Sequence, residues 1–296
     1  MKVLMCVTNI SEGKNEKLIS EVREAILATA DVKLLEVSTD RDHNRSVYSY
    51  LGAPEKVLEA TEKLAEISIR GIDMTTHKGD HPRMGAVDVV PFIPVRDIKT
   101  EEAVEIARQF GHFLGGKGVP VYYYEDAATS AERKNLVRIR KGQYEALPGK
   151  LADPSWAPDE GPAQFNPQAG ATAVGVRLPL IALNVNFHSV NLDLANTIAR
   201  SVRHLNGGLR YVRAIGVYLS DRGMVQVSMN LTNYRETPIH RVMEAVRSEA
   251  SRYGLAVASA ELVGPVPLEA MEDLVRFYVQ VHDFSAQQII ETNLLQ

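Results

Sequence analysis

Two histidines four residues apart, His77 and His81, lie in the segment that is richest in reactive side chains. Residues 77–86 read H-K-G-D-H-P-R-M-G-A and also contain an acid, two bases and two glycines. Histidine titrates near neutral pH, so one ring can accept and donate a proton within a single reaction cycle. Pro82 disfavours a helix at His81. We therefore expect His81 on a rigid turn and interpret it as an acid–base residue.

Two other interpretations of this segment are a metal site and a polar turn with exposed histidines. A His-x-x-x-His pair indicates zinc when both rings share one face of a helix. Gly79 and Pro82 interrupt any helix here, and the general-base Glu of the zinc motif is absent. We expect no metal, and the polar turn stays open as the alternative to acid–base chemistry.

Basic side chains elsewhere could serve an anionic ligand. Arg45 could bind a carboxylate through a bidentate fork, or it could be an ordinary surface cation. A cluster further along the chain is interpreted as a solvated helix face, with attraction of a carboxylate-rich ligand as the alternative. Its members are Arg133, Lys134, Arg138, Arg140 and Lys141.

Composition predicts an ordinary globular protein. The chain has 296 residues, a formal net charge of −4, 45% apolar residues and 24% charged residues, which suits two domains or one large one. The slight acidity argues against a general nucleic-acid binder. The single cysteine, Cys6, excludes an intramolecular disulfide. No apolar run reaches the roughly 20 residues of a membrane span, so we expect a cytoplasmic protein.

Each half of the chain predicts the order β-α-β-β-α-β from its hydrophobic periodicity. The first half has strands at Lys2–Asn9, Val32–Val37, Asn44–Leu51 and Val87–Val95, and helices at Asn15–Ala30 and Pro54–Arg70. The second half has strands at Leu180–Phe187, Tyr211–Leu219, Met224–Leu231 and Leu255–Val263, a helix at Leu192–Leu205, and a helix capped by Thr237 that runs to Tyr253.

This order predicts an α/β (α+β) protein of two tandem ferredoxin-like βαββαβ subdomains, at residues 1–178 and 179–296. A doubly wound sheet is the alternative, but the tight Asp221–Gly223 hairpin disfavours it. Between the halves we expect helices at Glu101–Leu114 and Ala131–Lys141 and a strand at Val119–Tyr124. The long Pro-rich loop that follows, Pro148–Pro179, is interpreted as a ligand-contacting crossover.

Several distinctive motifs are spread along the chain. They are C-V-T-N-I-S-E-G at Cys6–Gly13, H-N-R-S-V-Y at His43–Tyr48, I-D-M-T-T-H-K-G-D-H-P-R-M-G-A-V-D-V at Ile72–Val89, P-F-I-P-V-R at Pro91–Arg96, Y-E-A-L-P at Tyr144–Pro148, W-A-P-D at Trp156–Asp159 and L-V-G-P-V-P-L at Leu262–Leu268. With these motifs the chain resembles the formiminotransferase family, which includes glutamate formimidoyltransferase and the amino-terminal part of formimidoyltransferase-cyclodeaminase. The resemblance spans nearly the whole chain and is most specific over Ile72–Arg96.

The resemblance implies an enzyme with a ligand tunnel or cleft between its two subdomains. It implies transfer of a formimidoyl group from N-formimidoyl-L-glutamate to N5 of tetrahydrofolate, giving 5-formimidoyltetrahydrofolate and L-glutamate, in histidine degradation. Tetrahydrofolate would be the co-substrate, no metal would be needed, and the partner would be a second copy in a homodimer. An N-formyl-L-glutamate donor giving 5-formyltetrahydrofolate, a folate-binding module without catalysis, and a non-folate protein that reuses the fold remain as alternatives.

The family's catalytic histidine corresponds to His81. Its folate-binding loop corresponds to Pro162, Ala163, Gln164, Phe165, Asn166, Pro167, Gln168, Ala169, Gly170 and Ala171. Ser38 replaces an acidic residue that some relatives carry after the second strand, so Asp40, Asp42 or Asp80 is expected to hold positive charge near the reacting carbon. The candidates for the glutamate carboxylates are Arg45, Lys78 and Arg83.

Overall fold

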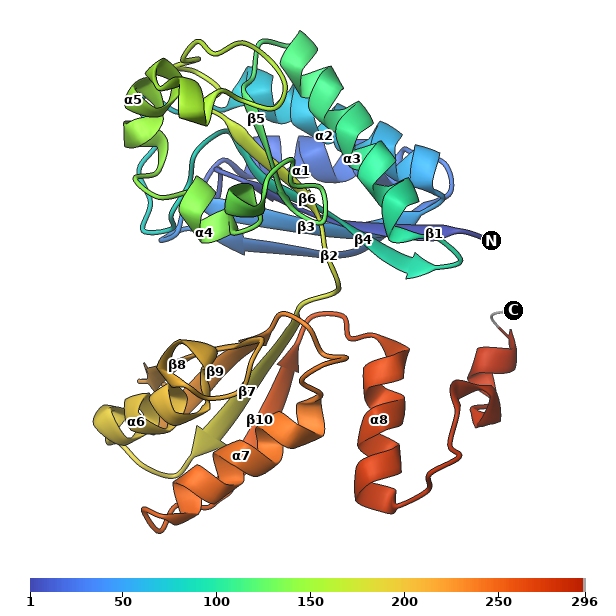
Figure 1. Ribbon diagram of the computed structural model, residues 1–296, viewed down its shortest axis with the longest axis vertical. Coiled ribbons are helices and arrows are strands. Elements are labelled where there is room, and N and C mark those ends of the chain that lie inside the picture. The colour runs from blue at the N-terminus through green and yellow to red at the C-terminus, as the bar shows by residue number, and fades with distance from the viewer. Residues whose placement is uncertain (295–296) are drawn as a thin grey trace. The chain divides into compact units, whose positions relative to one another are not determined.

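The computed structural model describes residues 1–294 and divides into two compact units, Met1–Arg177 and Leu178–Gln296. Each unit has its own sheet and its own hydrophobic core (Figure 1). The first sheet has six strands and the second has four. The predicted class, α/β with two tandem subdomains, is confirmed.

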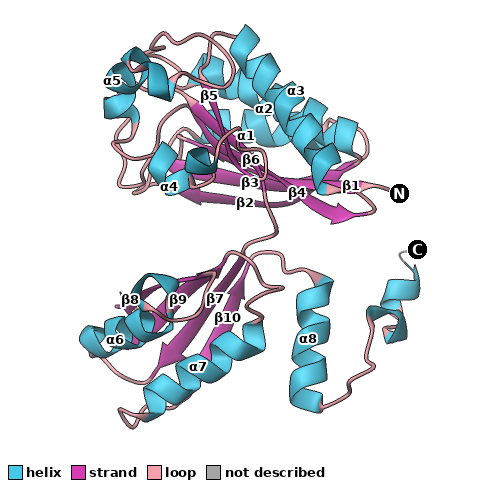
Figure 2. Cartoon of the chain, in the orientation of Figure 1, coloured by secondary structure: helices cyan, strands magenta, loops and turns pink. Residues whose placement is uncertain are grey.

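The first unit begins with the predicted order of elements. Its sheet starts β2-β3-β1-β4 with antiparallel neighbours, which is the arrangement of the split βαβ motif. Helices α1, α2 and α3 cover one face of this sheet (Figure 2). The elements are β1 (Val3–Ile10), α1 (Glu16–Leu27), β2 (Val32–Asp40), β3 (Arg45–Gly52), α2 (Pro54–Gly71), β4 (Val87–Arg96) and α3 (Thr100–Gly116).

Two parallel strands then widen the sheet beyond β4. β6 (Thr172–Val176) lies between β4 and β5 (Val121–Glu125) and is parallel to both. Residues 172–176 were expected in the Pro-rich loop but form a strand, so this prediction is wrong. All five residues of β6 are buried, and a strand covered on both faces shows no alternation that would distinguish it.

A second layer of short helices covers the other face at the β5 end. Tyr123 packs in the main core, whereas Tyr122 and Tyr124 join a separate cluster with α4 (Leu136–Ile139) and α5 (Leu147–Ala152). The single helix expected over Ala131–Lys141 is wrong, because a 3-10 turn and the four-residue α4 occupy this range.

The second unit repeats the same topology. Its strand order is β10-β7-β9-β8, with the tight hairpin at Asp221–Gly223 joining β8 to β9. Thr237 is not the expected cap, because α7 begins after Pro238 and the Thr237 hydroxyl donates to the Arg210 carbonyl. The elements are β7 (Ile181–Phe187), α6 (Leu192–Val202), β8 (Val212–Leu219), β9 (Met224–Leu231), α7 (Ile239–Ser251), β10 (Val257–Val263) and the unpredicted α8 (Leu268–Val279). Over residues 1–294, no helix combines the length and the apolar character that crossing a bilayer requires.

Candidate active site

His81 lies in the connection between α2 and β4, outside any helix or strand. Hydrogen bonds attach this connection to the turn between β2 and β3. The Asn44 side-chain amide donates to the Lys78 carbonyl over 2.9 Å, and the Asp80 N–H donates to the Asp42 carbonyl over 3.2 Å. These hydrogen bonds therefore hold the His81 loop against the β2–β3 turn.

The close approach of the two segments depends on Gly79. A Cβ at this position would lie 2.3 Å from the His43 carbonyl oxygen and 2.8 Å from the Asn44 Cβ. Asn44 itself has a φ of +48°, a left-handed conformation that asparagine adopts more readily than most residues. The glycine in H-K-G-D-H is therefore required for packing rather than for reactivity.

Two guanidinium groups flank the His81 ring. Arg45 Nη1 lies 2.5 Å from Nε2, and Arg140 Nη2 lies 3.4 Å from Nδ1. Because a guanidinium can only donate, the short contact makes Nε2 the acceptor and leaves the proton on Nδ1 of a neutral ring. Burial and the charges of Arg45 and Arg140 lower the pKa of His81 to about 3. The ring is neutral at pH 7 in the free protein.

Arg140 is held in place by an aspartate that the sequence analysis missed. Asp88 is 1% exposed and accepts hydrogen bonds from Arg140 Nη2 at 2.8 Å and from the Met84 N–H at 2.7 Å. Burial raises the pKa of Asp88, and these two donors oppose the rise. The available signal was a charged residue within the apolar strand A-V-D-V-V, because a buried charge needs a partner.

A second imidazole faces His81 from the β2–β3 turn. The ring centroids of His43 and His81 are 6.1 Å apart, with 65° between the ring planes. Asp40 Oδ2 lies 2.7 Å from Nδ1 of His43, and Asp40 Oδ1 accepts the backbone N–H groups of His43 and Asp42. The hydrogen bond from the His43 backbone N–H is the main cause that lowers the pKa of Asp40.

The predicted charged residues occupy contrasting surroundings. Arg83 is already paired with a carboxylate of the chain, because its Nη1 and Nη2 donate to Glu145 over 2.9 and 2.6 Å. The side chains of Asp42, Lys78 and Asp80 are exposed. Within residues 1–294, none of these three side chains forms a hydrogen bond or an ion pair with His81.

Arg45 differs from Arg83 because no carboxylate among residues 1–294 forms an ion pair with it, although the charges of Asp88 and Asp40 act on it from a greater distance. Its side chain is half-buried, and its hydrogen bond goes to the neutral ring of His81. Its Nε atom is buried without a hydrogen-bond partner. Burial lowers the pKa of Arg45. A guanidinium that forms no ion pair within the described chain and lies beside a neutral imidazole is suited to binding an anion.

The Pro162–Ala171 segment lies against the His81 loop, although the two are far apart in sequence. The Ala86 N–H donates to the Ala169 carbonyl over 2.8 Å, and the Ala171 N–H donates to the Met84 carbonyl over 2.9 Å. Residues 169–171 are buried and anchor the loop, whereas residues 162–164 are exposed. These backbone hydrogen bonds hold the two segments side by side.

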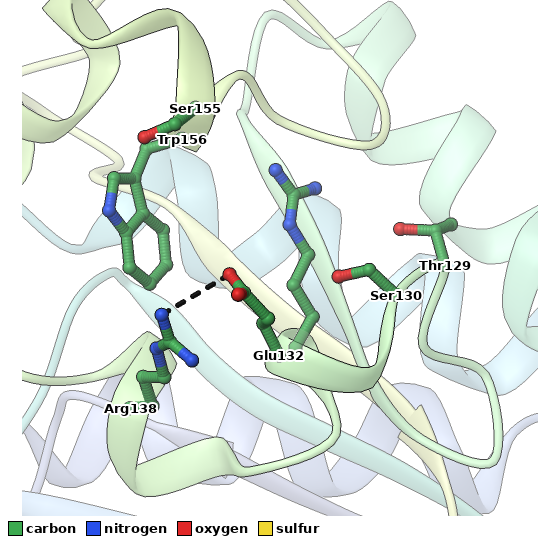
Figure 3. Close-up of a pocket in the computed structure, with 7 residues that line it drawn as sticks. Thr129, Ser130, Glu132, Arg138, Ser155 and Trp156 are labelled. Carbon is green, nitrogen blue, oxygen red and sulfur yellow. Dashed lines mark hydrogen bonds and ion pairs between the residues drawn. The ribbon is translucent and has the colours of Figure 1, made fainter.

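Two cavities of the first unit differ in their relation to His81. One of about 450 Å³ is lined by Ser11, Glu12, Asn15, Asn44, Thr76 and His77, so it adjoins the β2–β3 turn. Another of about 350 Å³ lies between Trp156 and Arg138, where Arg138 pairs with Glu132 (Figure 3). His81 and its neighbours His43, Arg45, Asp88 and Arg140 form what we call the His81 group. None of these residues lines the second cavity.

The basic cluster of residues 133–141 does not form one solvated face. Arg140 points to Asp88, as described above, and its side chain is 17% exposed. Arg133 is 15% exposed and pairs with the buried Asp159 at 2.7 Å. The interpretation as a solvated helix face is therefore wrong for both arginines, because the short α4 cannot hold the cluster on one side.

Comparisons with known proteins match both units. The family model of the formiminotransferase domain, N-terminal subdomain, matches residues 3–177, and that of the formiminotransferase domain matches residues 182–294. The chain belongs to the formiminotransferase family. It is 44% identical to the glutamate formimidoyltransferase of Streptococcus pyogenes serotype M1 and 41% identical to that of Thermoplasma acidophilum, over 99% of this chain and 99% and 98% of the relatives.

A longer relative shows where such a domain also occurs. The formimidoyltransferase-cyclodeaminase of Gallus gallus is 44% identical over 94% of this chain and 53% of its own length. In this formiminotransferase, the His81 group and the Pro162–Ala171 segment both fall within the part that the N-terminal subdomain model matches. Among residues 1–294, no three His, Cys, Asp or Glu side chains are grouped to hold a metal ion.

Proposed function

We propose that this formiminotransferase transfers the formimidoyl group of N-formimidoyl-L-glutamate to N5 of tetrahydrofolate, a step of histidine degradation, with His81 as the general acid–base residue. The full-length relatives named glutamate formimidoyltransferase support this reaction. The observation that carries the site assignment is the neutral ring of His81, whose Nε2 accepts a hydrogen bond from Arg45, a guanidinium that forms no ion pair with a carboxylate of residues 1–294.

His81 acts in this proposal as the base that receives the N5 proton. Its Nε2 lone pair is occupied by Arg45 in the free protein. A carboxylate of the substrate that binds to the guanidinium of Arg45 would neutralise the positive charge of Arg45. Loss of a neighbouring positive charge raises the pKa of an imidazole. A base works best when its pKa lies near the working pH. Substrate binding would thus release Nε2 and make it more basic.

The remaining candidates have supporting roles in the proposal. Tetrahydrofolate binds along the Pro162–Ala171 segment, whose anchored end lies beside the His81 loop. Asp40, Asp42 or Asp80 holds positive charge near the reacting carbon. Lys78 attracts the second carboxylate, and Arg83 would do so only by exchanging its bonds to Glu145.

We also propose the organisation of the enzyme. Residues 1–178 form the N-terminal subdomain with the catalytic histidine and the folate-binding loop, and residues 179–296 form the C-terminal subdomain. We expect a cytoplasmic homodimer with small-molecule substrates. Light scattering of the purified protein would measure its mass, and a monomer would contradict the dimer.

The test of function is a direct assay of the purified protein with tetrahydrofolate and each donor in turn. We expect 5-formimidoyltetrahydrofolate and L-glutamate, measured by mass spectrometry, from N-formimidoyl-L-glutamate. A higher kcat/KM with N-formyl-L-glutamate than with N-formimidoyl-L-glutamate would show that the formyl compound is the preferred donor. Tight folate binding with no product from either donor would contradict an enzymatic role.

A further inference from the structure

We propose that His43, oriented by Asp40, is a second catalytic residue that gives a proton to the departing glutamate nitrogen. This inference rests on the transfer reaction proposed above. It starts from a chemical requirement: one nitrogen must lose a proton while another, bonded to the same carbon, must gain one. Two imidazoles whose centroids lie 6.1 Å apart can face two such nitrogens at once.

The surroundings of the two rings assign opposite roles to them. His81 stands between Arg45 and Arg140, so a positive charge on its ring is opposed by two neighbouring positive charges. His43 stands against the carboxylate of Asp40 over 2.7 Å, so a positive charge on its ring faces a negative one. Paired titratable groups in opposite electrostatic surroundings indicate which is the base and which is the acid.

The Asp40 contact also decides which nitrogen of His43 can react. The lowered pKa of Asp40 keeps its carboxylate ionised at neutral pH, and an ionised carboxylate can only accept hydrogen bonds. Nδ1 of His43 therefore donates to Asp40 and Nε2 is left for the substrate. The side chain of His43 is 48% exposed, so a ligand can reach it. Asp40 is a positioning residue in this arrangement.

The proton balance closes with these two rings. N5 attacks the protonated amidine carbon, forming the N5–C bond while the C=N pair moves to the imino nitrogen. Nε2 of His81 then takes the proton from N5, and Nε2 of the protonated His43 gives one to the glutamate nitrogen. The bond from carbon to that nitrogen breaks with its pair as C=N re-forms. His81 has gained the proton that His43 has lost, and exchange with solvent restores both.

The test is steady-state kinetics of His43→Asn and His43→Ala. Asparagine can keep a donor for Asp40 but lacks Nε2, so we expect kcat to fall about 100-fold or more while KM for either substrate changes less than about threefold. Added imidazole should restore part of the activity of His43→Ala, which a purely structural role would not allow.

Two further variants separate the possible outcomes. Asp40→Asn retains an acceptor for the turn but not the charge, and we expect kcat to fall roughly 10-fold to 100-fold. His112→Asn, on the exposed face of α3, is the matched control and should match the parent protein. An active parent protein together with a fully active His43→Asn would overturn this inference alone. An inactive parent protein would instead overturn the proposed function.

Discussion

The two units share one topology, but only the first carries the dense group of reactive side chains. Both contain a βαββαβ core with the same strand order. In the first unit the connection between the second helix and the fourth strand runs over residues 72–86 and holds His81, whereas the equivalent connection in the second unit runs over residues 252–256. The shared fold is a scaffold, and the difference in loops decides where the proposed chemistry occurs.

The hairpins between the second and third strands differ in the same way. In the first unit the turn after Asp40 places His43 and Arg45 beside His81. In the second unit the corresponding turn is the tight Asp221–Gly223 hairpin, with exposed side chains. Equivalent positions of one topology thus carry a reactive group in one unit and a plain turn in the other. Substitutions can test this contrast.

The largest expected effect is on catalysis in the long loop of the first unit. His81→Asn should lower kcat by about 100-fold to 10,000-fold, because the proposed proton acceptor is removed, while folate binding changes little. Turnover measured at saturating substrates, together with folate affinity from calorimetry, checks this. The matched change in the second unit, His204→Asn, should keep full turnover. Near-normal turnover of His81→Asn would end the assignment.

The next effect is on stability and tests the buried ion pair. Asp88→Ala leaves the guanidinium of Arg140 without its carboxylate, and removing one partner of a buried pair costs about 3–5 kcal/mol in the free energy of unfolding. Denaturant titration measures the change. The exposed pair of the second unit gives the comparison, since Arg252→Ala should change stability by less than about 1 kcal/mol. Equal losses would contradict the contrast.

A smaller effect is expected from the packing of the reactive loop. Gly79→Ala places a Cβ against the backbone of His43, so the loop must shift, at a cost of about 1–3 kcal/mol and with reduced turnover. Gly149→Ala is the control: it has nothing within 4 Å and lies inside α5, so it should be neutral or stabilise by up to about 1 kcal/mol. Thermal unfolding of both variants decides.

The smallest effect concerns the pH dependence of stability. The pKa of His81 is about 3 in the folded protein and near 6.5 when unfolded, so the unfolded chain binds one more proton between these values. Stability contributed by this residue is therefore present above pH 6.5 and is lost as the pH falls toward 3. In a plot of the free energy of unfolding against pH, His81→Asn should have a shallower slope on the acid side. The difference in slope should correspond to up to one proton taken up on unfolding. Identical slopes would argue against the depressed pKa.

Local patterns predicted most of the fold because amphipathic helices and half-buried strands carry their period in the sequence. Two local predictions, the loop over the residues of β6 and the cap at Thr237, were wrong for different reasons. β6 is buried on both faces between two parallel strands, so its five residues show no alternation. Thr237 was misassigned as a helix cap because its hydroxyl has a tertiary partner in the Arg210 carbonyl. Long-range partners of this kind are not written in local spacing.

Residue types and motifs alone identified the family and led to the proposal that the segment around His81 is the reactive site. What the sequence left open was the electrostatic environment, because Arg45, Asp88 and Arg140 lie far apart along the chain. Folding brings two guanidinium groups to His81 and a carboxylate to His43. The two guanidinium groups oppose a positive charge on His81 and lower its pKa, whereas His43 faces a carboxylate. Since charge interactions depend on distance in space, the different roles proposed for the two rings could be argued only from the tertiary structure.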